Sequence, residues 1–270
     1  MRSLFQRSAA IAVAGGIALT GLLAGSLRVL ALTTEQVVER LRPVPVFAVT
    51  DADGTPLVAS TGEGEDSSPV AGVFISRQDA QQFLEGLKSR DPNIGNTVQV
   101  TTVSLAEIFE LAVRQQNVED ALRFYFVPMR QQVESARTVL QQNRQNPENF
   151  EGVPLFFLES TQEGGGYLTI QQGNQRVIPI FFTQQDLQAM QTRITQQEPS
   201  LSGRTRVQVT SLETLIQILQ SSDDPDLNQV VLVPPRETLE YIRTLQPTGQ
   251  NGSRPGNAPA AQPARGGANR

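Results

Sequence analysis

Apolar residues along the chain are grouped in short runs and helical stripes that recur in a fixed order. The run VPVFAV at residues 44–49 is typical of a buried strand, and the Gly-containing stretch at 51–54 after it indicates a turn. After residue 76, apolar positions recur every three or four residues, which is the spacing of an amphipathic helix. The predicted elements are strands at 44–49, 57–60, 72–75, 98–102 and 124–127, with helices beginning near residues 76, 105 and 128.

The same order of elements is written a second time about 107 positions later. Residues 70–81 match residues 177–188 at five of twelve positions, and residues 127–139 match residues 233–245 at six of thirteen. The opening strand recurs at 153–158 as VPLFFL. We therefore predict a mixed α/β protein with a tandem duplicated β-β-β-α-β-α-β-α unit and pseudo-twofold symmetry.

The first residues have the three parts of an export signal. Arg2 and Arg7 form a basic start, residues 9–27 are apolar, and Val29 and Ala31 are the small residues that signal peptidase accepts. Cleavage is expected after Ala31; an uncleaved membrane anchor is the alternative, because the apolar run approaches the length that spans a bilayer.

The remaining chain divides by composition. The prediction is a signal peptide at 1–31, a first repeat at 32–142, a linker at 143–152, a second repeat at 153–246 and a tail at 247–270. The tail is rich in Pro, Gly, Asn and Ala and holds Arg254, Arg265 and Arg270 without any acid, so we predict that it is basic and disordered.

Composition excludes several kinds of chemistry. The chain has no Cys and no His, which removes disulfides, thiolate nucleophiles, imidazole bases and the common zinc ligands. The net charge is −5, and because residues 1–31 and the tail each carry +3, the body between them carries −11. An acidic body repels polyphosphate, so nucleic acid is not an expected partner.

The remaining polar motifs do not form an active site. Asp51 and Asp53 are read as turn residues, because the further ligands of a calcium loop are missing. Three glycines at 164–166 lack the Gly-Lys-Ser/Thr sequence of a phosphate loop, and Lys88, the only lysine, lies at the polar end of a helix. We therefore expect no enzyme activity, no cofactor and no metal.

Apolar grooves for polypeptide are the better hypothesis. Aromatic residues concentrate in the predicted strands, and most of them should form the core. A duplicated unit tends to leave paired concave surfaces, and grooves lined by Phe, Leu and Met accept apolar segments of varied sequence. The candidate binding residues, on the equivalent helices of the two repeats, are Phe83, Leu87, Met190 and Ile194.

The chain also resembles a known family. The residues that carry the resemblance are those at 44–49, 69–76 with Asp79-Ala80, 126–128, 152–157, Phe181-Phe182 before Asp186-Leu187, and Val233-Pro234. They resemble the Tic22 family of cyanobacteria and chloroplast envelopes. The resemblance implies a pseudo-twofold α/β protein with apolar pockets on its two sides, and it implies no catalytic residues.

The resemblance also implies a place and a role. It suggests a periplasmic protein, with the thylakoid lumen as a second compartment, that acts like an ATP-independent chaperone in protein translocation or outer-membrane biogenesis. Unfolded polypeptides, including outer-membrane β-barrel precursors, would be its clients, and peripheral membrane association stays open. The alternative is a non-catalytic adaptor that docks on an Omp85-type pore.

Overall fold

The protein is described from a computed structural model. The structure describes residues 31–61, 68–116, 118, 121–148, 150–162 and 165–245. The predicted export segment, apart from Ala31, and the predicted tail at 247–270 lie outside these ranges, so both stay predictions.

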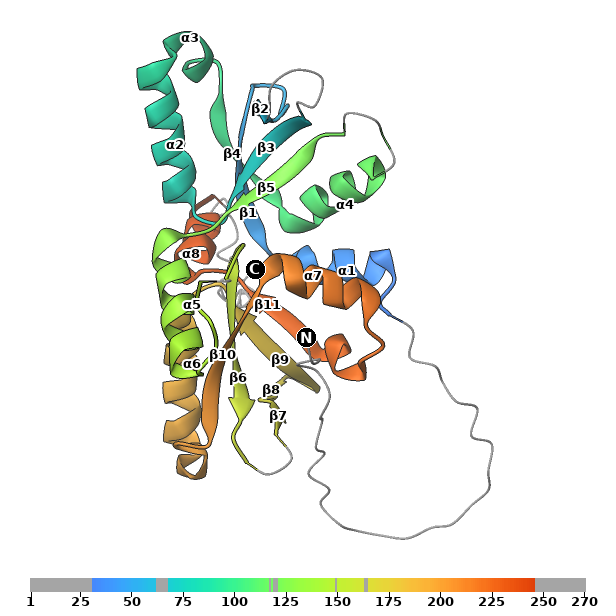
Figure 1. The fold of residues 1–270 in the computed structure, drawn as a ribbon, viewed down its shortest axis with the longest axis vertical. Helices are drawn as coiled ribbons and strands as arrows, with labels where there is room; N and C mark the ends of the chain where they lie inside the picture. The colour runs from blue at the N-terminus through green and yellow to red at the C-terminus, as the bar shows by residue number, and fades with distance from the viewer. Residues whose placement is uncertain are drawn as a thin grey trace, which may run out of the picture.

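Strands form two sheets, one from each half of the chain (Figure 1). The first sheet has the order β2-β3-β1-β4, with β5 on the other side of β3. The second has the order β10-β6-β9-β11, with β7 and β8 attached at its margin. The strands are β1 (Pro45–Thr50), β2 (Val58–Thr61), β3 (Ser68–Phe74), β4 (Gln99–Ser104), β5 (Arg123–Val127), β6 (Pro154–Ser160), β7 (Gly166–Tyr167), β8 (Ile170–Gln172), β9 (Gln175–Phe181), β10 (Thr205–Ser211) and β11 (Val230–Val233).

The two sheets have the same strand order and direction. Strands β4-β1-β3-β5 pair antiparallel, antiparallel and parallel, and β10-β6-β9-β11 do the same. The register agrees as well, since Gly72 faces Tyr125 in the first sheet and Pro179 faces Val231 in the second. The mixed α/β class is thus confirmed, and the matching order is what a duplication would produce; a common origin of the halves stays a prediction.

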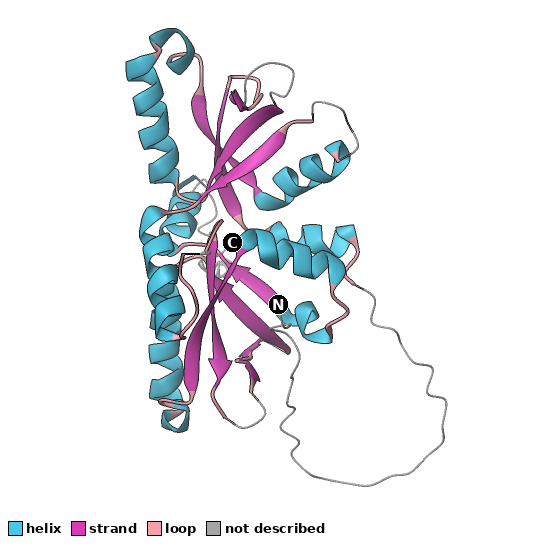
Figure 2. Ribbon diagram, in the orientation of Figure 1, coloured by secondary structure: helices cyan, strands magenta, loops and turns pink. Residues whose placement is uncertain are grey.

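Helices cover the sheets from two sides. Figure 2 shows α2, α8, α5 and α6 in one column beside the strands, while α4, α1 and α7 lie on the other side, between the two sheets. The helices are α1 (Thr34–Leu41), α2 (Arg77–Arg90), α3 (Pro92–Gly95), α4 (Leu105–Gln115), α5 (Arg130–Gln142), α6 (Gln184–Gln197), α7 (Leu212–Ser221) and α8 (Arg236–Leu245), with short 3₁₀ turns at Pro199–Leu201 and Pro225–Gln229.

Helix α1 is the main element that the sequence pattern did not predict. It is only eight residues long, which gives the helical periodicity little chain in which to show. Its signal is a capping box, in which the Thr33 side chain accepts the Gln36 N–H and the Gln36 side chain accepts the Thr33 N–H. Val37 and Leu41, both fully buried, attach it to α4 and α7.

The predicted starts of α2 and α6 are correct, but their caps differ. At α6 the Thr183 hydroxyl accepts the Asp186 N–H at 3.1 Å, as the spacing of these residues indicates. At α2 the equivalent Ser76 makes no side-chain cap bond. The sequence therefore predicts the start of both helices, but the side-chain capping hydrogen bond forms only at α6.

The last helix of each half packs on the sheet of the other half. Ala136 and Val139 of α5 are buried against Phe156 and Leu158 of β6. In return, Tyr241 of α8 packs on the first sheet, with its ring centroid 6.1 Å from that of Phe47. Neither half therefore completes its own core.

A third core joins the halves directly. It contains Val46 and Ile75 from the first sheet, Leu155 and Ile180 from the second, and buried side chains of α1, α4 and α7. Since one continuous cluster of buried side chains spans both sheets, the two halves form a single folding unit rather than two independent domains.

The joint between the halves depends on one glycine. Gly152 has φ of +86°, and a Cβ at this position would collide with the carboxylate of Glu213. That carboxylate accepts the Val153 N–H at 3.1 Å at the start of β6, and burial raises its pKa. Glycine is required here by both the backbone conformation and the close approach.

Substitution of Tyr241 tests the exchange of helices. Tyr241→Ala should lower the free energy of unfolding by about 2 kcal/mol, because the ring packs on Phe47 and the Arg77 guanidinium lies 4.2 Å above it. Arg243→Ala, at an exposed position of the same helix, is the control and should change stability by less than about 0.5 kcal/mol. Urea denaturation measures both; equal losses would mean that α8 is not part of the first core.

Candidate apolar grooves

The larger groove lies on the second sheet. Helix α6 stands beside β9 and β11, and between them is a hollow of about 990 Å³. Its floor is apolar, made by Val177, Pro179, Phe181, Val231 and Val233. We call this hollow the second groove.

Met190 and Ile194 form the wall of the second groove. They lie one turn apart on α6, so both side chains point to the same side of the helix. Met190 is 9% exposed and Ile194 is half-buried. A thioether and a branched aliphatic chain together give a wall that adapts to ligands of different shape.

The equivalent surface of the first half is more open and more aromatic. The positions that match the second groove are Val70, Gly72 and Phe74 of β3, Tyr125 and Val127 of β5, and Phe83 and Leu87 of α2. We call this apolar surface the first groove, because its positions correspond to those of the second groove. Tyr125 is 62% exposed and Phe83 is 39% exposed, and the ring of Phe83 lies 5.4 Å from that of Phe74.

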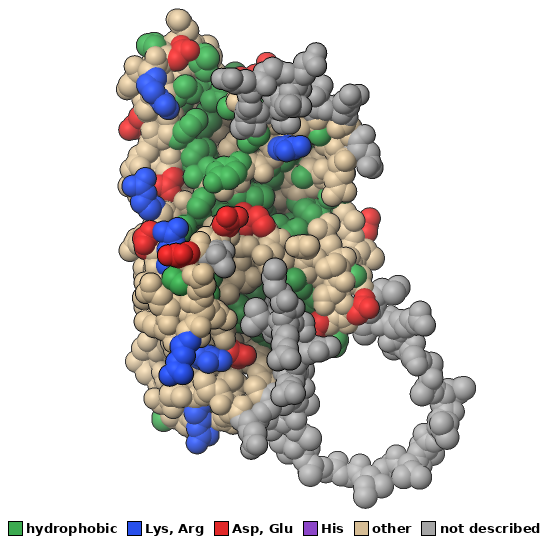
Figure 3. Space-filling view, in the orientation of Figure 1, with side chains coloured by type: hydrophobic (Ala, Val, Ile, Leu, Met, Phe, Trp, Pro, Cys, Tyr) green, Lys and Arg blue, Asp and Glu red, His purple; other side chains and the backbone are tan. Residues whose placement is uncertain are grey.

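The exposed apolar surface is visible on the outside of the molecule. Figure 3 shows hydrophobic side chains gathered over the half that contains the first sheet and α2. Besides Tyr125 and Phe83, Val58 of β2 is 45% exposed. A concentration of large exposed apolar side chains marks an interaction surface more often than chance exposure does.

The four residues predicted from the sequence fall on these two surfaces. Phe83 and Leu87 lie together on the first groove, and Met190 and Ile194 lie together on the second. The structure does not bring the two pairs into one site. That they bind polypeptide stays a prediction.

Strand β5 divides its aromatic side chains between two faces. Phe124 and Phe126 pack against the core between the sheets, whereas Tyr125 is 62% exposed. Strand alternation puts Tyr125 on the opposite face from its neighbours. The partner on that face is Gly72, which leaves the tyrosine ring uncovered on the sheet.

Polar residues at the rim distinguish the second groove. Arg176 and Arg193 are exposed there, together with Glu198 and several glutamines. At the positions that match the two arginines the first half has Pro69 and Gly86. The grooves thus share a framework, but not the chemistry of their rims.

A polar cleft of about 370 Å³ lies where α2, α5, α6 and α8 begin. Within it, Gln132 of α5 is buried; its amide oxygen accepts the Gln184 N–H at 2.9 Å, and its amide nitrogen donates to Gln185 at 2.8 Å. Asp186 accepts the backbone N–H of Arg236 at 3.1 Å. These bonds satisfy helix-terminal N–H groups and hold the exchanged helices in place.

Asp79 is the ionisable group in this cleft whose pKa departs clearly from its ordinary value. Burial raises its pKa, and the nearby Arg130 partly opposes that effect. No Cys or His exists to act with it, and its hydroxyl neighbour Ser76 is a buried helix-start residue. The cleft has the parts of a structural junction and lacks a nucleophile paired with a base.

Within the described ranges, no group of three or more acidic side chains is placed to hold a metal ion. Asp51, considered above as a ligand, instead accepts the N–H groups of Asp53 and Thr55 in a turn. Among the helices of the described residues, none combines the length and apolar character that crossing a bilayer needs.

Comparison with known proteins gives the family. The model of the Tic22-like family matches residues 7–244, and the chain belongs to this family. A solved structure of Anabaena Tic22, titled as a protein of protein transport, has a TM-score of 0.70 and 32% identity, over 80% of this chain and 98% of that one. Tic22 from Plasmodium falciparum shares the fold, with a TM-score of 0.61 and 18% identity over 77% of this chain and 96% of that one.

Plant relatives are more distant in sequence. The chloroplastic TIC 22-like protein of Arabidopsis thaliana is 25% identical over 76% of this chain, and the chain covers only 62% of that protein. The chloroplastic TIC 22 protein of Pisum sativum is 24% identical over 76% of this chain and 74% of its own length. Both the recognition of the family and the mixed α/β fold are thereby confirmed.

Polar substitutions in the grooves should weaken the binding of apolar probes. Phe83→Gln and Ile194→Gln each remove an apolar wall residue that is partly exposed, so we expect about fivefold weaker binding of an apolar fluorescent dye to the affected groove. Leu245→Gln is the matched control, because Leu245 is 56% exposed but lies outside both grooves. Dye titration measures the effect, and an equal loss in the control would contradict it.

Proposed function

We propose that this protein is an ATP-independent, chaperone-like polypeptide-binding protein that acts in protein translocation or outer-membrane protein biogenesis. The observation that carries the proposal is the pair of matching apolar grooves on α2 and α6, one lined by Phe83 and Tyr125 and the other by Met190 and Ile194. The family relatives support it, since the Anabaena protein is titled as one of protein transport.

Weak binding by burial of apolar surface explains how such a protein would release its clients. A client side chain placed in a groove gains about 25 cal/mol for each Å² of apolar surface that leaves water, without a demand for one sequence. Exchange is then set by affinity alone. The rim of the second groove holds exposed polar residues, so a segment bound there can enter and leave through solvent.

The proposed place of action is the periplasm, with the thylakoid lumen as a second compartment. Support comes from the export signal expected at residues 1–31 and from the relatives in plants, which are named as chloroplastic. No enzyme activity is proposed, because the acids in the central cleft are used in helix contacts and the chain lacks Cys and His.

The test is protection of an unfolded client. The mature chain should slow the aggregation of an unfolded outer-membrane β-barrel precursor at a near-stoichiometric ratio, as followed by light scattering. The double variant Phe83→Gln/Ile194→Gln should protect less, whereas Leu245→Gln should protect as the parent does. No protection by the parent chain would sink the proposal.

The rival is an adaptor that docks on an Omp85-type pore. The acidic body, with a charge of −11 over residues 32–246, is the feature that favours it. If the protein is an adaptor, replacing surface acids with lysine should abolish its binding to the pore. The same variants should still protect an unfolded client from aggregation as well as the parent chain does. Loss of protection in the groove variants and not in the charge variants would favour the chaperone.

A further inference from the structure

The edge strands of the two sheets differ in how well they are protected from pairing with another chain. A terminal strand presents N–H and C=O groups that can pair with another chain, and proteins usually cover such an edge or make it polar. Among the described residues, the short strands β2, β7 and β8 each pair with a strand on one side only. The strands that end the matching four-strand ladders are β4 and β5 in the first sheet and β10 and β11 in the second. Three of them are protected in a visible way.

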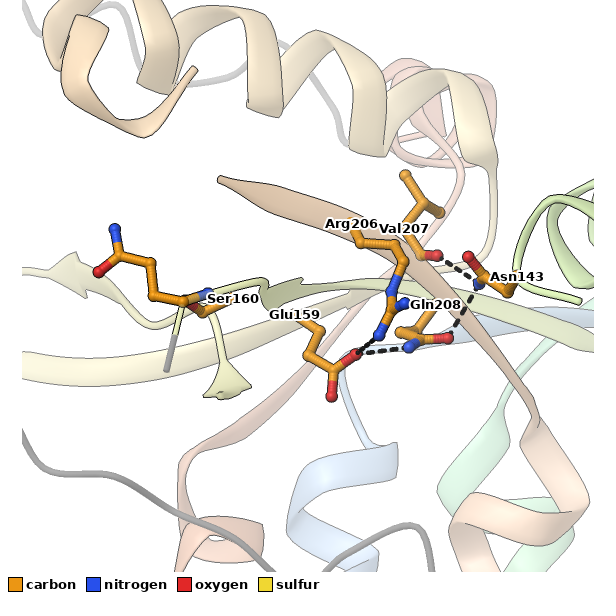
Figure 4. A network of polar contacts seen from close by, with 7 residues as sticks. Asn143, Glu159, Ser160, Arg206, Val207 and Gln208 are labelled. Carbon is orange, nitrogen blue, oxygen red and sulfur yellow. Dashed lines mark hydrogen bonds and ion pairs between the residues drawn. The ribbon is translucent and has the colours of Figure 1, made fainter. Parts of the chain in front are cut away.

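The edge of β10 is closed by a side chain of the exchanged helix α5. The amide nitrogen of Asn143, at the end of α5, donates to the Val207 carbonyl at 2.9 Å and to Gln208 at 3.0 Å. Gln208 and Arg206 in turn donate to Glu159 on β6 (Figure 4). A strand from outside would have to displace this network.

The edge of β11 is covered by α1. Helix α1 packs against β11 and α7, and Arg40 donates to the backbone carbonyl of Asn228 at 3.0 Å, two residues before the strand. Val230 and Leu232 of β11 point into the core that α1 shares, and they are only 5% and 3% exposed.

The edge of β4 is protected by its composition. Its sequence, QVTTVS, is largely polar, and the Thr101 hydroxyl is 2.7 Å from that of Thr50 on the neighbouring strand. Ser104 at its end donates to the Arg42 carbonyl at 3.0 Å and caps α4.

Strand β5 has none of these protections within the described part of the chain. Its sequence is RFYFV, and its only strand partner there is β3. Phe124 and Phe126 occupy the positions of Val230 and Leu232 and are half-buried against the core, where α4 packs on β5. An aromatic, unprotected edge of this kind is what proteins otherwise avoid.

We propose that the edge of β5 pairs with an extended segment of a client polypeptide, which adds one strand to the first sheet. This inference rests on the proposed function and gives the conformation of the client: extended, with apolar side chains at every second position. Those side chains would lie beside Tyr125 and Phe83 in the first groove, while the backbone pairs with β5. The second groove, whose edge strand β11 is covered, binds side chains without this pairing.

The size of the edge argues for a client segment rather than a second copy of this chain. Five residues of strand extend over only about 17 Å, which offers a few hydrogen bonds and a small contact area. A stable dimer usually buries more than about 1,000 Å² in total. A short edge next to an apolar groove suits transient binding of one extended segment.

The experiment separates backbone pairing from side-chain binding. The probe is a short synthetic peptide in which Val and Phe alternate with Thr, compared with the same peptide N-methylated at every second residue. N-methylation keeps the apolar side chains but removes the N–H groups that pair with a strand edge. With the mature chain, residues 32–270, the parent peptide should slow hydrogen exchange of the β5 amides, and N-methylation should weaken binding by about tenfold or more.

Two variants make the test specific to β5. Tyr125→Lys puts a charge on an exposed edge position, so it should weaken binding of the alternating peptide and abolish the protection of β5. Leu245→Lys is the matched control at an exposed apolar position outside both grooves, and it should leave the exchange of β5 amides in the complex unchanged.

Three outcomes would overturn the inference. Equal binding of the two peptides would mean that the grooves hold side chains only, and the proposed function would survive. Binding of neither peptide, with no protection of a precursor, would remove the proposed function too. Concentration-dependent protection of β5 without peptide, with a dimer in sedimentation, would assign the edge to a second copy.

Discussion

The exchange of the last helix of each half, α5 and α8, is the constraint on which the rest of the structure depends. A sheet with one face packed against a core must have its apolar side chains covered, and here the cover for each sheet comes from the other half of the chain. Ala136 and Val139 of α5 bury Phe156 and Leu158, while Tyr241 of α8 packs on Phe47. Because each half supplies what the other lacks, the two grooves are held in a fixed relation within one folded unit.

The two halves share a framework but differ at their surfaces. Register places Gly72 against Tyr125 and Pro179 against Val231, so the floors of the grooves correspond residue by residue. The first groove is nevertheless open and aromatic, and the second is a deeper hollow with Met190 and Ile194 on its wall. Helix α1 also breaks the symmetry, because it belongs to the first half in sequence but packs against strand β11 of the second.

Much of the fold could be predicted because the signals are local. Apolar runs and turn residues located most of the strands, and the three-residue spacing of Thr183 and Asp186 located the start of α6. The candidate residues Phe83, Leu87, Met190 and Ile194 could be placed in two pairs by helical periodicity. The role of Tyr125 could not be predicted, since its exposure depends on Gly72, a residue 53 positions away that is adjacent only in the folded sheet.

The sequence by itself determined the class of fold, the order of elements in each half, the acidic charge of the body and the absence of Cys and His chemistry. These are properties of residue type and of spacing within a few turns or strands. Only the tertiary structure decided which half covers which sheet, which aromatic rings stay exposed and which strand edge stays open. Those outcomes depend on contacts between residues far apart in the chain, such as Asn143 with Val207 and Arg40 with Asn228. The periodicity of apolar residues along the chain does not indicate which distant residues become such partners.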